Sequence, residues 1–411
     1  MNILRLSSIL FLFLVAMALP PAVAQDSALP KLDQELASGE RPVKIVCFGD
    51  SVTGLYYHTG GVRTYTDMLG IALRQIHTKA DVTMINAGIS GHTTVNALAR
   101  IEKDVLSHHP DLVTVMFGLN DMVKVPVEGY RKNLIEIVRQ CRAAGAEVIL
   151  CTPNAVITTP NRPVEKLIEY CEVVRAVARE YQVPLSDSFA EFEAFGKREP
   201  DAWRLTLSDE IHPNMAGHKR IAEQIARTIT GKAASLAAIG PPGSALERTA
   251  EKLKAGNLIK VLAMPPFDGW VTEALARVVP GAKIEVVSWP IKGMSLFELR
   301  KDASHRVRPM KPDLVLIAVP RSASAESRES FIHDQMWIAN YSQSFGKKEW
   351  DVVVIHPSLA EPNSDASESE NDALIRSITA AQDLSLIDRE PGDERRPEEI
   401  LADWMKAEFA R

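Results

Sequence analysis

From Val43 onward the chain alternates short apolar runs with longer stretches in which apolar residues recur at helical spacing. The apolar runs are Val43–Phe48, Val82–Ile85, Leu112–Phe117, Glu147–Cys151 and Val183–Leu185. The helical stretches are Thr66–His77, Ala97–Ser107, Tyr130–Ala144, Val164–Tyr181 and the closing His218–Ile229. Continuous apolar strands separated by helices indicate a parallel sheet that is covered on both faces. The alternation therefore predicts an α/β fold, whose ligands bind at the carboxyl ends of the strands.

The first 24 residues have the pattern of an export signal. Arg5 precedes an unbroken apolar run, Ile9–Leu19, and Ala22-Val23-Ala24 follows as a cleavage signature. The run is shorter than the roughly 20 residues that a membrane-spanning helix needs, although an uncleaved anchor remains an alternative. We therefore expect residues 1–24 to be a signal peptide, and the protein to be periplasmic or extracellular without stable membrane insertion.

Composition narrows the classes of partner and cofactor. The 411 residues carry a formal net charge of −6, so no basic field exists to replace the counterions of a nucleic acid. The four cysteines, Cys47, Cys141, Cys151 and Cys171, are too few for a disulfide scaffold. One bridge, between Cys141 and Cys171, is possible in an exported protein. No C-x-x-C motif occurs, which argues against a thiolate zinc site; we expect no metal and no cofactor.

The length favours two domains, and the second half repeats the pattern of the first. The sequence Gly240-Pro241-Pro242-Gly243 marks a boundary. At a constant offset of 202, Ile291-Lys292-Gly293 falls on Ile89-Ser90-Gly91. Six such matches in the same order predict a duplicated domain; two unrelated α/β domains are the alternative. The predicted divisions are an N-terminal segment 25–40, a first domain 41–235, a linker 236–256 and a second domain 257–411.

The residues that point to chemistry follow the strands of the first domain. In Gly49-Asp50-Ser51-Val52 a serine stands on a tight turn from strand to helix, which exposes its hydroxyl. A serine needs a base to act as a nucleophile, and Asp209-Glu210-Ile211-His212 can supply one. Because Asp209 and His212 are three residues apart, we expect one helical turn to place them on the same face. His212 would take the proton of Ser51 while Asp209 orients the imidazole.

Acyl transfer also requires donors for an oxyanion. The backbone N–H groups of Ser51 and Gly91 and the side-chain amide of Asn120 are the candidates, because all three follow consecutive strands. Tyr56, Tyr57 and His58 come shortly after the nucleophile, where they would either wall the substrate pocket or pack in the core.

Together these blocks resemble the SGNH/GDSL hydrolase family over about residues 41–230. The matching residues are Ser51, Gly91, Asn120 and His212. The resemblance implies a flavodoxin-like three-layer α/β/α sandwich with a five-stranded parallel sheet. It also implies ester hydrolysis through an acyl-serine without a metal. In the second copy Phe267, Ser322 and Arg396 align with Ser51, Asn120 and His212, so we expect that copy to be inert and to pack on the first.

The sequence thus predicts a serine esterase that acts on a small or polymer-attached ester. A short acetyl ester on a carbohydrate is the favoured substrate, by analogy with other exported enzymes that carry an appended domain. A lysophospholipase or lipase-like esterase and an acyltransferase are alternatives that use the same residues. A surface protein that binds a glycan or a partner without turnover is the alternative from another class.

Overall fold

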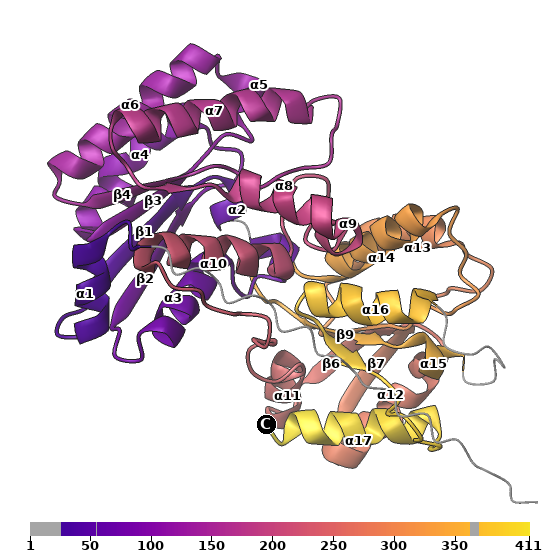
Figure 1. Ribbon diagram of the computed structural model, residues 1–411. Coiled ribbons are helices and arrows are strands. Elements are labelled where there is room, and N and C mark those ends of the chain that lie inside the picture. Colours follow the sequence, from indigo (N-terminus) through magenta and orange to yellow (C-terminus); the bar gives the residue numbers. More distant parts are fainter. Residues whose placement is uncertain (1–25, 55, 362–369) are drawn as a thin grey trace, which may run out of the picture.

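The computed structural model describes residues 26–54, 56–361 and 370–411. The predicted signal peptide, residues 1–24, lies outside this part of the chain. Two α/β units make up the described structure: an N-terminal unit, residues 26–230, and a C-terminal unit, residues 247–411 (Figure 1). Within the described ranges, no helix is both long and apolar enough to cross a bilayer.

The N-terminal unit contains one five-stranded parallel sheet. Its strands are β1 (Val43–Gly49), β2 (Val82–Gly88), β3 (Leu112–Met116), β4 (Glu147–Cys151) and β5 (Leu185–Ser186). Their order across the sheet is β2-β1-β3-β4-β5, which is the flavodoxin-like order. The predicted fold class is therefore confirmed. The order reverses between β1 and β3, and the carboxyl ends of strands at such a reversal form a crevice for ligands.

Helices cover both faces of this sheet. One layer contains α1 (Pro30–Ser38), α3 (Tyr65–Ile76) and α10 (Met215–Thr230), which contact one another through α10. The other contains α4 (Thr94–Asp104), α6 (Val127–Ala143) and α7 (Val164–Glu180) (Figure 1). Two helices that apolar periodicity did not predict, α8 (Ser188–Arg198) and α9 (Pro200–Arg204), lead towards the C-terminal unit. The segment 25–40 contributes α1, because Leu32 and Leu36 are buried in the core.

The C-terminal unit has the same topology. Its strands are β6 (Leu258–Ala263), β7 (Lys283–Ser288), β8 (Leu314–Ile317), β9 (Asp351–Ile355) and β10 (Ser385–Ile387). Their order is β7-β6-β8-β9-β10, so strands that correspond in chain order occupy corresponding places in the two sheets. Its helices are α11 (Glu247–Lys254), α12 (Phe267–Val278), α13 (Leu296–Met310), α14 (Arg328–Ser342), α15 (Pro357–Ala360), α16 (Glu370–Ala381) and α17 (Pro397–Phe409). The same fold therefore occurs twice, each time around its own hydrophobic core.

Two local features differ from, or add to, the sequence expectations. Helix α11 lies inside the predicted linker 236–256, and its Leu253 belongs to the second core. Cys141 and Cys171 are both buried free thiols, so the possible bridge between them does not form. Burial raises the pKa of the Cys141 thiol to about 12, which makes it a small core residue rather than a reactive group.

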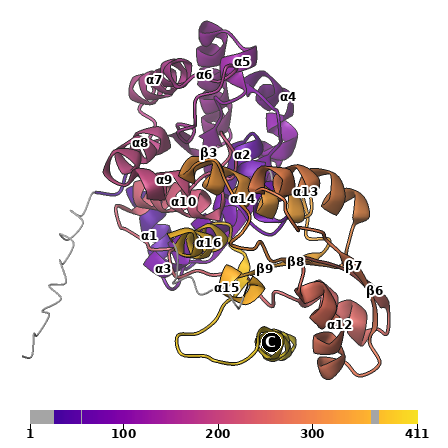
Figure 2. The same cartoon turned by 90° about the vertical axis from the view of Figure 1, so that its right-hand side faces the viewer.

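The two units touch along a polar interface. Arg63 forms an ion pair of 2.6 Å with Asp383, and Arg204 forms one of 2.6 Å with Glu329. Helix α14 contacts η1 (Tyr56–Thr59), the 3₁₀ helix that follows the Ser51 turn, and α16 contacts α10. Figure 2, turned by 90° from Figure 1, shows α14 and α16 beside the helices of the N-terminal unit. The C-terminal unit thus reaches the carboxyl edge of the first sheet.

Candidate active site

Ser51 is the first residue of α2 (Ser51–Gly54), directly after β1. The turn requires glycine at position 49, because a Cβ there would lie 2.7 Å from the carbonyl oxygen of Met116. Asp50 stabilises the turn by accepting a hydrogen bond of 3.0 Å from the backbone N–H of Val52. The serine hydroxyl is held at the carboxyl edge of the sheet, where the sequence predicted it.

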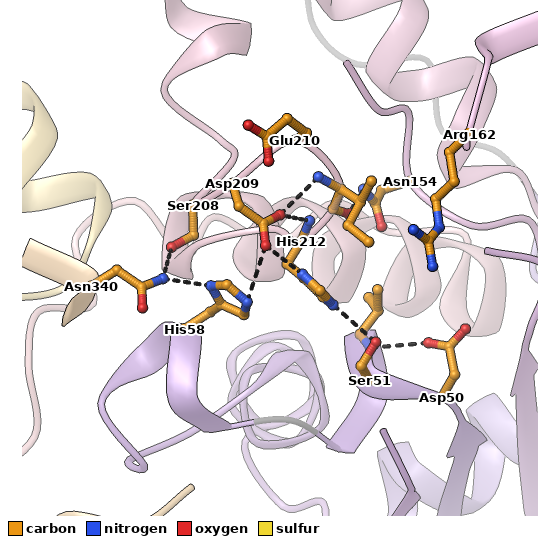
Figure 3. Close-up of polar contacts among 12 residues, drawn as sticks. Asp50, Ser51, His58, Asn154, Arg162, Ser208, Asp209, Glu210, His212 and Asn340 are labelled. Carbon is orange, nitrogen blue, oxygen red and sulfur yellow. Dashed lines mark hydrogen bonds and ion pairs between the residues drawn. The ribbon is translucent and has the colours of Figure 1, made fainter. Parts of the chain in front are cut away.

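Ser51, His212 and Asp209 form a continuous series of polar contacts (Figure 3). Ser51 Oγ lies 3.0 Å from His212 Nε2, and His212 Nδ1 lies 2.7 Å from Asp209 Oδ2. A proton on Nδ1 would be shared with the carboxylate, which leaves the Nε2 lone pair facing the serine hydroxyl. The geometry is that of a nucleophile, a base and a group that orients the base.

The sequence argument for how Asp209 and His212 meet was wrong. Both lie in the loop between α9 and α10 rather than on a helix. Asp209 Oδ1 accepts hydrogen bonds from the backbone N–H groups of Ile211, at 2.8 Å, and His212, at 2.6 Å. An aspartate side chain that bonds to the backbone two or three residues onward closes a tight turn without a helix. This turn brings the two side chains together.

Neighbouring groups stabilise the negative charge of Asp209. Burial by itself would raise its pKa, but the charge of His212 and the hydrogen bonds of that residue hold the pKa below its ordinary value. Asp209 is only 8% exposed, so its charge acts on His212 with little screening by water. The site can therefore stabilise a protonated His212.

Asn120 and Gly91 follow β3 and β2, the strands on either side of β1, at the same sheet edge. Asn120 Nδ2 lies 3.1 Å from the His92 carbonyl oxygen and 3.5 Å from Asp50 Oδ2. Gly91 adopts the left-handed conformation, with φ +76°. The structure thus brings the proposed oxyanion donors to the carboxyl ends of β1, β2 and β3.

Arg162 orients the amide of Asn120, a role that the sequence did not indicate. Its Nη2 donates to Asn120 Oδ1 at 3.4 Å, and its Nε donates to the Leu119 carbonyl oxygen at 3.1 Å. Because a guanidinium can only donate, it must face the amide oxygen, and the amide NH₂ then faces the His92 carbonyl oxygen and Asp50 Oδ2. Arg162 lies in the long segment between β4 and α7, which no local motif marks.

Asp50, the residue before Ser51, lies next to the Asn120 amide and is almost completely buried. Burial raises its pKa to about 7, and the nearby charge of Asp121 adds to that effect. Asp121 itself accepts hydrogen bonds from the N–H and hydroxyl of Thr94, which ties the loop after β3 to the start of α4.

Three further buried side chains support the 208–212 loop. Asn154 Nδ2 donates to the Ile211 carbonyl oxygen at 3.0 Å. His58 stacks on His212, with ring centroids 4.4 Å apart, and Asn340 lies beside His58 (Figure 3). The sequence reading offered His58 as a pocket wall or a packing residue and gave no role to Asn154 or Asn340. The side chains of Tyr56 and Tyr57 lie outside the described part of the structure.

His58, Asp209 and His212 are also close enough to be considered as a metal-ligand set, with ligand atoms within 4.8 Å of one another among the described residues. Their nitrogen atoms already face other partners: His58 Nδ1 faces the Asn340 amide, and His212 Nε2 faces Ser51. The same Asp209 oxygen lies next to both rings. The contacts of His58, Asp209 and His212 are therefore those of a hydrogen-bonded network.

The corresponding positions of the C-terminal unit form no such series. Phe267 is a buried residue at the start of α12, Ser322 donates to Glu361, and Arg396 pairs with Glu399. Gly293 keeps the left-handed conformation of Gly91, with φ +75°.

Comparison with known proteins places the N-terminal unit in a family. Residues 47–220 match the GDSL-like Lipase/Acylhydrolase family. The chain is 27% identical over 217 residues to an acetylxylan esterase of Geobacillus stearothermophilus, an alignment that covers 47% of this chain and 96% of that protein. An arylesterase of Vibrio mimicus is 28% identical over 194 residues, with coverages of 47% and 91%. A lipase/acylhydrolase structure from Enterococcus faecalis has 27% identity and a TM-score of 0.40, and covers 46% of this chain and 96% of its own. Residues 47–220 are therefore a domain that matches the GDSL-like lipase/acylhydrolase family.

Proposed function

We propose that this protein is a serine esterase that hydrolyses carboxylic esters through an acyl-serine intermediate. The observation that carries the proposal is the series from Ser51 Oγ to His212 Nε2, at 3.0 Å, and from His212 Nδ1 to Asp209 Oδ2, at 2.7 Å. Acyl transfer requires such contacts between a nucleophile, a base and an orienting carboxylate, and they support the proposal.

In the acylation step, Ser51 Oγ attacks the ester carbonyl carbon while its proton moves to His212 Nε2. The carbonyl π pair moves to oxygen, and the N–H groups of Ser51 and Gly91 and the Asn120 amide stabilise the resulting oxyanion. As the tetrahedral intermediate collapses, the alkoxy group leaves with the proton from His212. The acyl group remains on Ser51.

In the deacylation step, His212 takes a proton from water as the water oxygen attacks the acyl carbon. Collapse of the second intermediate returns the proton to Ser51 Oγ and releases the carboxylic acid. Asp209 stays ionised throughout and offsets the positive charge that His212 carries in each transition state. These steps use only groups of the protein and water.

For the substrate we propose a short-chain ester, with an acetyl group on a carbohydrate as the first choice. Relatives named acetylxylan esterase, from Geobacillus stearothermophilus, and isoamyl acetate-hydrolyzing esterase, from Saccharomyces cerevisiae, support this choice. Another relative is named thioesterase 1/protease 1/lysophospholipase L1, from Escherichia coli, so lysophospholipids are the main competing substrates. Acyl transfer to a sugar in place of water uses the same residues.

We also propose that residues 41–235 are the catalytic domain and that residues 257–411 are a copy without ester hydrolysis of its own. Export through residues 1–24 to the periplasm or the extracellular space is part of the same proposal. A relative of 28% identity named an uncharacterized lipoprotein, from Bacillus subtilis, supports an exported setting.

The test is a substrate panel with the mature protein. Acetylated xylo-oligosaccharides, short-chain nitrophenyl esters and lysophospholipids are compared by kcat/KM, and covalent labelling by an organofluorophosphate is measured in parallel. We expect the acetyl esters to be preferred, and both hydrolysis and labelling to vanish in Ser51→Ala with folding intact. A wild-type protein that neither hydrolyses any panel member nor takes the label would overturn the proposal in favour of a non-catalytic glycan- or partner-binding protein.

A further inference from the structure

The C-terminal unit contributes a side chain to the polar network around Ser51. Asn340 lies on α14, and His58 lies in η1 of the N-terminal unit, 282 positions away in the chain. Asn340 is fully buried, and His58 is 1% exposed. The two side chains meet where the units contact one another, and Figure 3 shows the series Asn340, His58, Asp209 and His212 in one view.

The chemistry of Arg308 settles which way the Asn340 amide faces. Arg308 Nη2 donates to Asn340 Oδ1 at 3.1 Å and to the Asn340 carbonyl oxygen at 2.9 Å. A guanidinium has donors only, so the amide oxygen must face it. The amide NH₂ then faces two acceptors, His58 Nδ1 at 2.6 Å and Ser208 Oγ at 2.9 Å.

This orientation determines the tautomer of His58. Because Nδ1 accepts a hydrogen bond from the amide, it carries no proton, and the ring proton of neutral His58 sits on Nε2. That nitrogen lies 3.3 Å from Asp209 Oδ2, next to the shorter 2.7 Å contact of His212. His58 is therefore neutral, and its Nε2 lies beside the same carboxylate oxygen as His212 Nδ1.

A neutral His58 matters because its ring is stacked on His212 at 4.4 Å. Two imidazoles beside one carboxylate compete for its charge, and a second imidazolium would repel the first. The charged or titratable groups that act on His58 are His212, Asp209, His218 on α10 and Arg308 on α13. Burial and the neighbouring His212 keep the pKa of His58 well below its ordinary value.

We propose that Asn340 is a positioning residue for the esterase site: it holds His58 in the neutral Nε2–H form, so that no second imidazolium competes with His212 for the charge of Asp209. The C-terminal unit, in which Phe267 and Arg396 stand at the positions of Ser51 and His212, thereby becomes part of the active site of its neighbour. This inference rests on the proposed function for its catalytic consequence, but its structural claim, the protonation state of His58, can be measured independently.

The direct test is histidine ¹⁵N NMR of the full mature protein, with the His58 signals assigned by their loss in His58→Phe. We expect the pattern of a neutral Nε2–H imidazole from pH 5 to pH 8. An Nδ1–H tautomer or an imidazolium in that range would overturn the proposal, whether or not the protein hydrolyses esters.

The kinetic test replaces the donor with an acceptor. In Asn340→Asp a carboxylate faces Nδ1 and favours a doubly protonated His58, whose charge opposes protonation of His212. We expect kcat to fall by at least about 10-fold with KM within about twofold, and the acid limb of the kcat/KM profile to move to lower pH by about half a unit. Unchanged values in a folded variant would contradict the proposal.

Two controls distinguish an effect of Asn340 on His58 from a loss of contact between the two units. In the His58→Phe background Asn340→Asp should have no further effect on the pH profile, because the group through which it acts is gone. Asp383→Asn removes the 2.6 Å ion pair between Asp383 and Arg63 across the same interface, and its pH profile should match that of the wild type. If Asp383→Asn shifted the profile as Asn340→Asp does, the effect would belong to docking of the units, and the proposal would fail. Hydrolysis that is absent from the wild type would instead refute the proposed function alone.

Discussion

Gly91 and Gly293 adopt the same left-handed backbone conformation, with φ +76° and +75°, although 202 positions and a whole sheet separate them. Each glycine follows the second strand of its unit, β2 or β7. The same turn therefore occurs in both units, whereas Phe267 and Arg396 of the second unit stand at the positions of Ser51 and His212. The pair offers a matched test of what the turn contributes.

We expect Gly91→Ala to lower kcat by about 10-fold, because relief of the strain at φ +76° would displace the backbone N–H, a proposed oxyanion donor. A Cβ at either glycine would meet no atom within 4 Å, so the cost is backbone strain of roughly 1–2 kcal/mol rather than a clash. Gly293→Ala should carry the same strain without a loss of activity. Steady-state kinetics and thermal unfolding of both variants check this, and equal activities in the two would argue against a role for Gly91.

Removal of the Asn120 amide should lower kcat more than Gly91→Ala does. Loss of one oxyanion donor typically lowers kcat by about 10²–10³-fold, and we expect Asn120→Ala to fall in that range with little change in KM. Arg162→Met should show a smaller loss of the same kind, since Arg162 only orients the amide through its 3.4 Å contact with Asn120 Oδ1. A loss in Arg162→Met that exceeded the loss in Asn120→Ala would show that Arg162 acts in another way.

Asp209→Asn tests the orienting carboxylate. The asparagine side chain has one oxygen that accepts and one NH₂ that donates, whereas the carboxylate of Asp209 accepts through both oxygens. If the NH₂ faces the ring, His212 no longer holds its proton on Nδ1 and loses its preferred tautomer. We expect kcat to fall by about 10³–10⁴-fold. Because the pKa of Asp209 is held below its ordinary value, protonation of Asp209 should not shape the acid limb of the wild-type pH–rate profile. Wild-type kcat in a folded Asp209→Asn variant would rule out the assigned role.

Stability should fall in mild acid because of His218. Burial lowers the pKa of this histidine to about 3 in the folded protein, whereas an unfolded histidine titrates near 6.5. Between these values the unfolded state binds a proton that the folded state does not, so the free energy of unfolding decreases as the pH falls, by about 1.4 kcal/mol per unit.

Thermal unfolding between pH 7 and pH 4.5 measures this slope. His218→Gln should reduce the slope, since a glutamine oxygen can still accept from the Tyr65 N–H that His218 Nδ1 faces at 3.2 Å. The exposed His305 on α13 supplies a control, His305→Gln. A slope that is the same in the wild type and in His218→Gln would mean that other groups determine the acid sensitivity.

Much of the fold could be predicted from the sequence because its signals are local. Apolar runs such as Glu147–Cys151, which became β4 with the same bounds, need only neighbouring residues to be recognised. The repeat at an offset of 202 likewise predicted that one topology would occur twice, as the two strand orders show. Helix α8, by contrast, was missed, although Phe192 is buried in the core.

Ser51, Gly91, Asn120, Asp209 and His212 could be named from sequence because each stands in a short motif at a strand end or before the closing helix. The turn that joins Asp209 to His212 could not, because its form depends on which backbone N–H groups the carboxylate reaches after folding. Arg162 could not be found either, since its partner Asn120 is 42 positions away.

The sequence by itself determined the fold class, the occurrence of one topology twice and the candidate residues for acyl transfer, because strand patterns and strand-end motifs consist of residues that are close together in the chain. Only the tertiary structure decided how those residues are held. The amide of Asn340, fixed by Arg308, reaches His58 from the other unit. Hydrogen-bond donors and acceptors become partners through packing, and no spacing along the chain records a contact across 282 positions.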